Sequence, residues 1–204
     1  MKHIFNNIIK RGDWRYSNTV CGGGSTLEYT EPLRNALPEF LTNHNINSML
    51  DAPCGDYSWM QLVEFPAGFK YIGGDIVEFL IENNRQSHPS TEFLNFDLTT
   101  TPLPDVDLLF CRDCLFHLSY DDIMLVFKNI ARSNIKYILT TSYYPGHYSN
   151  IDIKTGDFRP ISLLEIPYSL PEPVDSIDDW IPEYAARRLC LWSINTIKQR
   201  VETL

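Results

Sequence analysis

The stretch 47–60 constrains the fold more than any other part of the chain. An apolar run at 49–50 ends at the carboxylate of Asp51, and residues 52–56, which include a proline and a glycine, turn the chain. Residues 59–63 are typical of the start of a helix. A strand, a tight turn and a helix in this order predict one unit of an open α/β sheet, where ligands bind at the carboxyl ends of the strands.

Two further strands are expected to end at an acidic residue. Residues 69–75 predict a second strand that ends at Asp75, and residues 92–97 predict a third that ends at Asp97. Asp75 lies about 20 residues beyond Gly55, the separation at which an acid on the second strand meets a ribose diol in folds of this kind. The three acids would therefore share one edge of the sheet.

The second half of the chain continues the pattern. Residues 108–111 predict a fourth strand that is apolar throughout, and residues 136–142 predict a fifth. Ser119 is expected to cap a helix between them, with Asp122 reaching back to the cap. The apolar positions of this helix recur at helical spacing, at Ile123, Val126, Phe127 and Ile130.

Other elements lie outside this core. A short helix is expected within the first 20 residues, a helix capped by Thr30 is expected to continue to about Asn43, and residues 77–85 predict another helix. Residues 143–171 are rich in proline and aromatic side chains and predict an irregular insertion. Two short runs after it predict an antiparallel strand pair at 174–177 and 189–194.

Strands that alternate with helices predict an α/β protein with a doubly wound, mostly parallel sheet of the seven-stranded type, closed by a C-terminal antiparallel strand pair. The 204 residues fit a single domain over 1–204, and 44% hydrophobic content is ordinary for a globular protein.

Composition excludes several classes of partner. Lys and Arg number 17 against 26 Asp and Glu, which gives a net charge of −9 and argues against a nucleic-acid substrate. Residues 1–10 are too short and too polar for a signal peptide or a membrane span. Five cysteines at irregular spacing do not form a disulfide framework. We therefore expect a soluble, cytoplasmic protein.

The turn after Asp51 resembles motif I of the class I S-adenosylmethionine-dependent methyltransferases, in which a strand-ending acid precedes a glycine-containing turn. The usual motif has three alternating glycines after the acid, and the corresponding places here hold Pro53, Gly55 and Tyr57. The pattern of strands and helices is similar to that superfamily over nearly the whole chain. The resemblance implies S-adenosylmethionine as the cofactor, with S-adenosylhomocysteine as the product.

In that superfamily the first and fourth strand ends hold the methionine moiety, the second the ribose and the third the adenine. Asp51 could attract the cationic amino end, and Asp97 could accept a hydrogen bond from the adenine amino group. Ile76 and Leu98 could sandwich the ring. The predicted cofactor residues are Gly23, Ser25, Asp51, Ala52, Pro53, Cys54, Gly55, Trp59, Asp75, Ile76, Asp97, Leu98, Cys111 and Arg112. The glycine run at 22–24 is equally typical of a flexible connector.

The resemblance also divides the chain by role. Residues 1–46 would form a helical lead-in with a glycine-rich loop, 47–142 the cofactor-binding core, and 143–204 the acceptor-side insertion with the closing strands. The motifs at 22–25, 51–56, 112–118 and 158–160 resemble those of a branch of the superfamily that is found beside enzymes that build surface glycans.

That branch implies an acceptor hydroxyl on a glycan or an activated sugar. An alcohol acceptor needs a base, and His117, with Asp113 to orient its ring, is the predicted pair. A packing role for His117 stays open. Aromatic faces and a forked donor suit sugar rings, and the predicted acceptor residues are Trp14, Tyr143, Tyr144 and Arg159.

Other functions are weighed against this one. A nicotinamide-dependent dehydrogenase shares the strand and the turn, but Asp51 and Asp56 would repel its pyrophosphate. Cys111 and Cys114 could form a redox pair or half a zinc site, yet no second pair follows, so we expect no metal and treat these cysteines as small hydrophobic residues. O- or N-methylation of another small molecule and a non-catalytic binding module remain alternatives.

Overall fold

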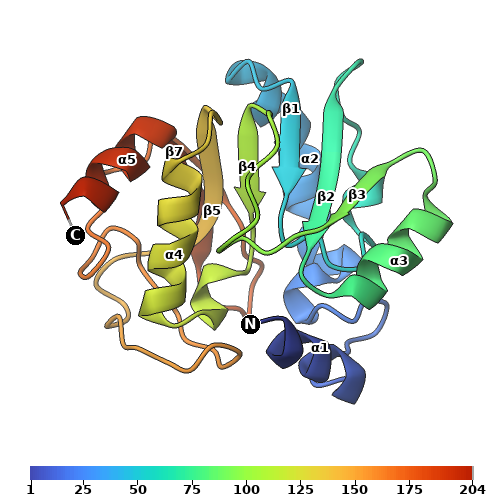
Figure 1. Cartoon of the computed structure of the whole chain (residues 1–204), viewed down its shortest axis with the longest axis horizontal. Helices are drawn as coiled ribbons and strands as arrows, with labels where there is room; N and C mark the ends of the chain where they lie inside the picture. Colours follow the sequence, from blue (N-terminus) through green and yellow to red (C-terminus); the bar gives the residue numbers. More distant parts are fainter. Residues whose placement is uncertain (204) are drawn as a thin grey trace. The chain divides into compact units, whose positions relative to one another are not determined.

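The computed structural model describes residues 1–203 (Figure 1). Contacts divide the chain into two compact units, Met1–Asp97 and a second unit that begins at Leu98. We describe each unit separately. The division falls inside the predicted 47–142 core, and a single domain over the whole chain stays a prediction.

The first unit contains three parallel strands in the order β3-β2-β1 (Figure 1). They are β1 (Ser48–Asp51), β2 (Lys70–Asp75) and β3 (Glu92–Asn95). Its helices are α1 (Lys2–Arg11), α2 (Leu27–Asn43) and α3 (Glu78–Ser87), with two short 3-10 turns, η1 (Gly23–Ser25) and η2 (Met60–Leu62). Helix α3 packs against β2 and β3.

The second unit contains four strands in the order β4-β5-β7-β6. Strands β4 (Leu108–Cys111) and β5 (Tyr137–Tyr143) pair in parallel. Strand β7 (Arg187–Ser193) pairs antiparallel with both β5 and β6 (Asp175–Asp178). The other elements are η3 (Leu115–His117), α4 (Tyr120–Ala131) and α5 (Ile194–Glu202). The predicted α/β class, the mostly parallel pairing and the closing antiparallel pair are confirmed.

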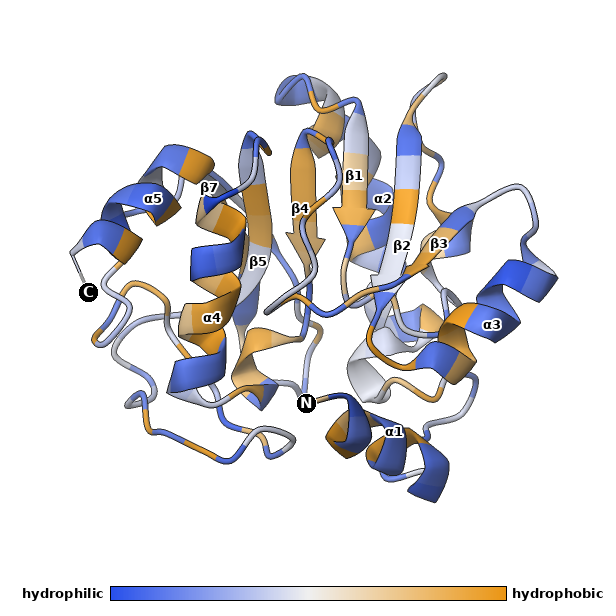
Figure 2. Ribbon diagram, viewed as in Figure 1, coloured by the Kyte–Doolittle hydropathy of each residue, from blue (hydrophilic) through white to orange (hydrophobic). Residues whose placement is uncertain are grey.

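The core of the second unit follows the hydrophobic pattern of the sequence. All four residues of β4 are fully buried, as is the apolar stripe of α4 at Ile123, Val126, Phe127 and Ile130. Figure 2 shows this stripe along α4 and the continuous apolar colour of β4. Apolar side chains removed from water in this way are the main stabilising contribution to such a sheet.

One prediction that matters for the site is wrong. No α-helix follows β1 in the described residues 52–69, where η2 is the one helical turn. Tyr57 adopts a left-handed backbone with φ 57°, and the Ser58 N–H donates to the Asp56 carboxylate instead of entering a helix. Trp59 and Met60 are buried, and Pro66 stops the segment. The segment is therefore fixed by side-chain anchors and not by a helical ladder.

Other features of the fold also differ from prediction. Strand β3 ends at Asn95, so Asp97 lies two residues beyond it. The Asp122 carboxylate does not reach back to the cap, because it accepts from the Thr155 hydroxyl, whose oxygen accepts from the Ser119 N–H at 3.0 Å. Helix α5 has no counterpart among the predicted elements. It begins at an N-cap, Ser193, that is also the last residue of β7.

The N-cap of helix α2 lies four residues before the predicted cap. The Thr26 hydroxyl accepts from the Tyr29 N–H at 3.2 Å, which makes Thr26 the N-cap. Thr30 lies inside the helix, where its hydroxyl donates to the Thr26 carbonyl at 2.9 Å. The predicted end near Asn43 is confirmed.

Thr26→Ala tests this helix start. Loss of an N-cap side chain leaves a helix N–H group unsatisfied, so the free energy of unfolding should fall by about 1 kcal/mol in urea titrations. Thr26→Ser, which keeps the hydroxyl, is the matched control and should lose only a few tenths of that amount. Equal losses for the two variants would contradict the assignment of the cap.

Candidate functional site

The carboxylate of Asp75 organises the predicted cofactor turn in the first unit. It stands at the end of β2 and is only 5% exposed. One of its oxygens accepts from the Gly55 N–H at 3.0 Å and the other from the Val77 N–H at 2.8 Å. Burial raises the pKa of Asp75 to about 6, although these two N–H groups act in the opposite direction. The group is therefore mostly ionised at neutral pH and has lone pairs left to accept further hydrogen bonds.

Gly55 is held from the other side as well. Its carbonyl accepts from the Asn84 side-chain amide on α3 at 2.8 Å, and its φ of 58° suits glycine. A Cβ at this position would come within 2.5 Å of the Cys21 sulfur. The turn thus requires glycine for its backbone conformation and for its contact with the N-terminal segment.

Asp56 ties the N-terminal segment to the same turn. One of its oxygens accepts from the Thr19 hydroxyl at 2.8 Å and from the Val20 N–H at 2.9 Å. The glycine run that follows folds into the 3-10 turn η1, where the Ser25 hydroxyl donates to the Cys21 carbonyl at 3.3 Å. Gly23 and Ser25 thus lie in an ordered turn a few residues after Thr19 and Val20, which bond to Asp56. Their contact with the cofactor stays a prediction.

The other predicted cofactor residues of this unit surround the turn. Asp51 is buried and accepts from the Tyr71 hydroxyl at 2.7 Å, and burial together with Asp51 raises the pKa of Tyr71. Ala52, Cys54 and Trp59 are buried, whereas Pro53, Ile76 and Asp97 are half-buried. Trp59 is buried in the core, so only the exposed edge of its ring could contact a cofactor.

A network of four charged side chains, three of them buried, lies at the end of β4 in the second unit. Arg112 makes a forked ion pair with Asp179, with Nε–Oδ2 at 2.8 Å and Nη2–Oδ1 at 3.0 Å. Arg187 donates to Asp113 at 2.7 Å and lies 3.7 Å from Asp179. Two positive and two negative groups balance, which is the condition under which buried charges are tolerated. Arg112 is predicted to contact the cofactor, but its guanidinium is directed to Asp179.

Asp113 is fixed in backbone and side chain. Its backbone is left-handed with φ 52°, and the Thr141 hydroxyl both accepts from its N–H at 2.9 Å and donates to its carboxylate at 3.1 Å. Burial alone would raise the pKa of Asp113, but Arg112 and Arg187 hold it below its usual value. A carboxylate that is ionised and paired in this way is a poor proton acceptor, so it can act by orientation and charge.

His117 ends the 3-10 turn η3 and is half-buried. Its Nδ1 lies 2.8 Å from the Asp157 carbonyl oxygen, which can only accept, so Nδ1 carries the proton and the neutral ring has its lone pair on Nε2. Burial lowers the pKa of His117, while the Asp157 carbonyl and Asp113 raise it. A neutral imidazole in a fixed tautomer meets the chemical requirement for a general base.

The predicted acceptor residues are divided between the two units. Trp14 belongs to the first unit, where it packs on Phe5 with ring centroids 5.9 Å apart. Tyr143 is buried, and the Tyr144 hydroxyl donates to Asp178 at 2.6 Å. Arg159 is also buried, and its N–H groups donate to the carbonyls of Ile151 and Leu115 and to the Tyr168 hydroxyl. Contact between Arg159 and an acceptor would require some of these bonds to break.

Sequence reasoning missed several residues that build these sites. Asn84 had a readable signal, since it is a polar residue on the apolar face of a predicted helix. Asp179, Arg187 and Thr141 had none, because they reach Arg112 and Asp113 from strands far along the chain. Tyr71 was also missed.

The cysteines, the metal-binding side chains and the helices add three observations. Cys111 is buried, Cys114 is half-buried, and the five cysteines are free thiols. Among residues 1–203, no group of three or more His, Cys, Asp or Glu side chains is placed to hold a metal ion. Within the same residues, every helix is too short or too polar to cross a membrane.

The comparisons with known proteins agree with this geometry. Residues 50–135 match the family model described as a methyltransferase domain. No curated protein matches the sequence significantly. The matched stretch is somewhat less than half of the 204 residues, and it is similar to a methyltransferase domain.

Solved structures share the fold at low sequence identity. A SAM-dependent methyltransferase from Leishmania major has a TM-score of 0.67 at 15% identity, over 93% of this chain and 83% of that chain. Magnesium protoporphyrin IX methyltransferase from Synechocystis with bound SAH has a TM-score of 0.64 at 13% identity, over 94% of this chain and 97% of that chain. The N-methyltransferase NodS from Bradyrhizobium japonicum has a TM-score of 0.58 at 11% identity, over 81% of this chain and 96% of that chain. The methyltransferase fold is thus confirmed, and the glycan-associated branch stays a prediction.

Gly55→Ala tests the packing of the turn. A left-handed alanine and a Cβ pressed against the Cys21 sulfur should together lower the free energy of unfolding by roughly 1–3 kcal/mol or more. Gly68→Ala is the control, because Gly68 also has a positive φ, at +78°, but a Cβ added there would have no neighbouring atom within 4 Å. Urea titrations of both variants measure the difference.

The double variant Gly55→Ala with Cys21→Ala should recover part of that difference, since the close sulfur is gone while the backbone strain remains. A double-mutant cycle with no coupling between the two sites would contradict this account of the turn.

Proposed function

We propose that this methyltransferase transfers the methyl group of S-adenosylmethionine to a hydroxyl oxygen of a sugar, on a glycan or an activated sugar, and that His117 is the general base. The observation that carries the proposal is the neutral imidazole of His117, whose tautomer is set by the Asp157 carbonyl. An oxygen acceptor loses one proton as it is methylated, and such a ring can receive it.

The residues of the first unit fit the cofactor. The buried carboxylate of Asp75 can accept both ribose hydroxyl protons with the lone pairs that the backbone N–H groups leave. The carboxylate of Asp51 suits a cationic amino group. Asp97 would accept from the adenine amino group. When bound, S-adenosylmethionine supplies a methyl group on a positively charged sulfonium, which the acceptor displaces in line.

Charge separates this cofactor from a dinucleotide. Asp51 and Asp56 flank the turn, and the hydrogen bonds to Asp56 come from uncharged donors, the Thr19 hydroxyl and the Val20 and Ser58 N–H groups. A pyrophosphate would meet two carboxylates at this turn, and the described residues 52–69 place no α-helix N-terminus after it. A cofactor without phosphates avoids that repulsion.

The surroundings of His117 support a sugar acceptor. The Phe158 ring, 56% exposed, lies 5.8 Å from the His117 ring and 5.2 Å from the Phe116 ring. An exposed aromatic face suits the apolar face of a sugar ring. Asp113, held ionised by Arg112 and Arg187, would stabilise the imidazolium once the proton has moved to Nε2.

Asp75→Ala tests the cofactor site. Calorimetric titration should show a loss of about 1.5–3 kcal/mol in S-adenosylmethionine affinity, the cost of a charge-assisted hydrogen bond. Because the ionised carboxylate is the acceptor, wild-type affinity should weaken as the pH falls through about 6, and the variant should lack that dependence.

Glu82→Ala, an exposed acid on α3, is the control and should bind as the wild type does. A folded wild type that bound NAD and ignored S-adenosylmethionine would overturn the assignment.

His117→Ala tests the base. Turnover should fall by roughly 10²–10⁴-fold while cofactor affinity stays unchanged. Since burial lowers the pKa of His117, wild-type turnover should rise with pH to a plateau, with its midpoint below about 6.5, and the variant should lose that limb. His3→Ala, an exposed histidine outside the candidate site residues, is the control for both readouts.

A lower melting temperature with intact turnover in His117→Ala would make His117 a packing residue. The base would then have to be sought at Tyr144 or His147, because Asp113 is held ionised by Arg112 and Arg187.

A further inference from the structure

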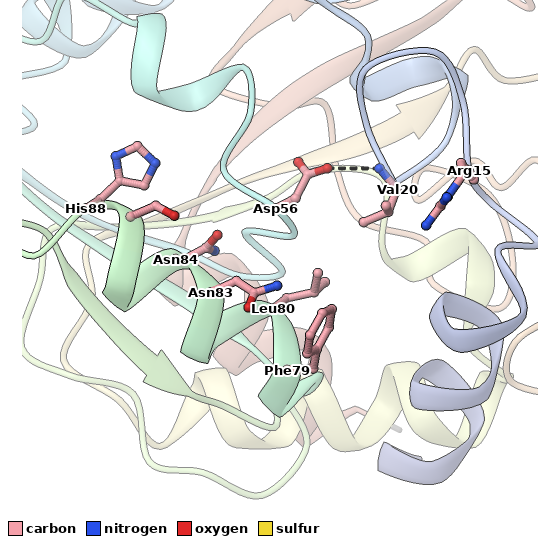
Figure 3. Close-up of a pocket in the computed structure, with 9 residues that line it drawn as sticks. Arg15, Val20, Asp56, Phe79, Leu80, Asn83, Asn84 and His88 are labelled. Atoms are coloured by element: carbon pink, nitrogen blue, oxygen red, sulfur yellow. Dashed lines mark hydrogen bonds between the residues drawn. The ribbon is translucent and has the colours of Figure 1, made fainter.

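One face of α3 is left open in the first unit. The chain between β1 and β2 forms the single turn η2, so no α-helix from the described residues 52–69 packs along α3 on this side. A pocket of about 340 Å³ lies there instead, between α3, the turn at Asp56 and the N-terminal segment at Arg15 and Val20 (Figure 3). Its volume is at the lower end of the range for small-molecule sites.

Two walls of this pocket are held rigidly. Asp56 is fixed by the Thr19 hydroxyl and the Val20 N–H, and the second of these bonds is drawn in Figure 3. Asn84 is fixed by its bond to the Gly55 carbonyl. Pre-formed walls reduce the entropy lost when a ligand binds.

The rest of the lining combines an aromatic ring with polar groups that remain accessible. Phe79 is 57% exposed, and Figure 3 shows it beside Leu80 on the side of the pocket that α3 forms. Arg15 and Asn83 are exposed, and their side chains make no hydrogen bond or ion pair to the described residues. The pocket therefore offers one aromatic face and several donors and acceptors to a ligand.

Charge decides which class of ligand fits. The lining carries one guanidinium, of Arg15, and one carboxylate, of Asp56. A phosphate or nucleotide would meet the carboxylate, and a cation would meet the guanidinium. A neutral molecule with hydroxyl groups on its edge and C–H groups on its face matches the lining without an unpaired charge.

We propose that this pocket binds a neutral sugar ring, with its C–H face on Phe79 and its hydroxyl groups on Asn83 and Arg15. The choice of ligand comes from the lining of the pocket and not from His117. The proposal also deepens the proposed function, because it gives a carbohydrate acceptor a second place of contact on the protein. The two proposals can fail separately.

Saturation-transfer NMR on the full chain tests this pocket. The probes are methyl glycosides of glucose, galactose, mannose and N-acetylglucosamine, each titrated against the protein. At least one glycoside should receive saturation on its ring protons, and its dissociation constant should rise ~3- to 10-fold in Phe79→Ala and in Asn83→Ala, the loss expected for one aromatic or hydrogen-bond contact.

Matched controls separate the pocket from the rest of the surface. Gln86→Ala removes an exposed amide of α3 outside the pocket, and Tyr16→Ala removes an exposed aromatic ring of the N-terminal segment outside it. Both should bind the glycoside as the wild type does. All four pocket and control positions are exposed, and melting curves verify that the variants fold.

The proposal is overturned if no glycoside binds, if binding is unchanged in both Phe79→Ala and Asn83→Ala, or if inorganic phosphate displaces the glycoside. Sugar methylation with no effect of the pocket variants on binding would remove this pocket and leave the proposed function standing. Binding at the pocket with no methylation of any sugar would support the pocket and contradict the proposed function.

Discussion

The predicted cofactor turn depends on one buried carboxylate. Asp75 accepts from the N–H groups of Gly55 and Val77, so the turn after β1 and the turn after β2 are joined through a single side chain. Burial raises the pKa of Asp75 to about 6, and these two charge-assisted bonds offset part of the cost of burying the ionised carboxylate. A carboxylate fixed in this way is pre-organised to accept further hydrogen bonds.

The second unit uses charge differently. Arg112, Asp113, Asp179 and Arg187 form a balanced and largely buried network, in which no member could be removed without leaving an uncompensated charge. The pKa of His117 reflects opposed contributions. Burial, Arg159 and Arg187 lower it, whereas Asp113 raises it. The network thus places an ionised Asp113 close enough to act on His117 without taking the proton itself.

The sequence predicts those parts of the molecule that short-range patterns determine. Strand β4 has the predicted bounds, because four apolar residues lie between a polar turn and Arg112. The segment after β1 has the helical spacing of Trp59, Met60 and Val63, but burial of Trp59 and Met60 and the bonds of Asp56 fix it otherwise.

Long-range pairs left no signal. Asp179 lies 67 residues beyond Arg112, so nothing in the local pattern indicates that the two form a buried ion pair. The candidate base, by contrast, is indicated by its place after β4, and the structure adds the Asp157 carbonyl that sets its tautomer.

The central claim, methyl transfer to a sugar hydroxyl, is tested most directly by product mass spectrometry. Wild-type protein is incubated with S-adenosylmethionine that carries a deuterated methyl group and with a panel of free sugars, activated sugars and oligosaccharides. The account predicts one labelled methyl group on a hydroxyl oxygen of one sugar class, located by fragmentation, and almost no product with His117→Ala. Label on a nitrogen atom, or no labelled sugar from a protein that binds the cofactor, would contradict it.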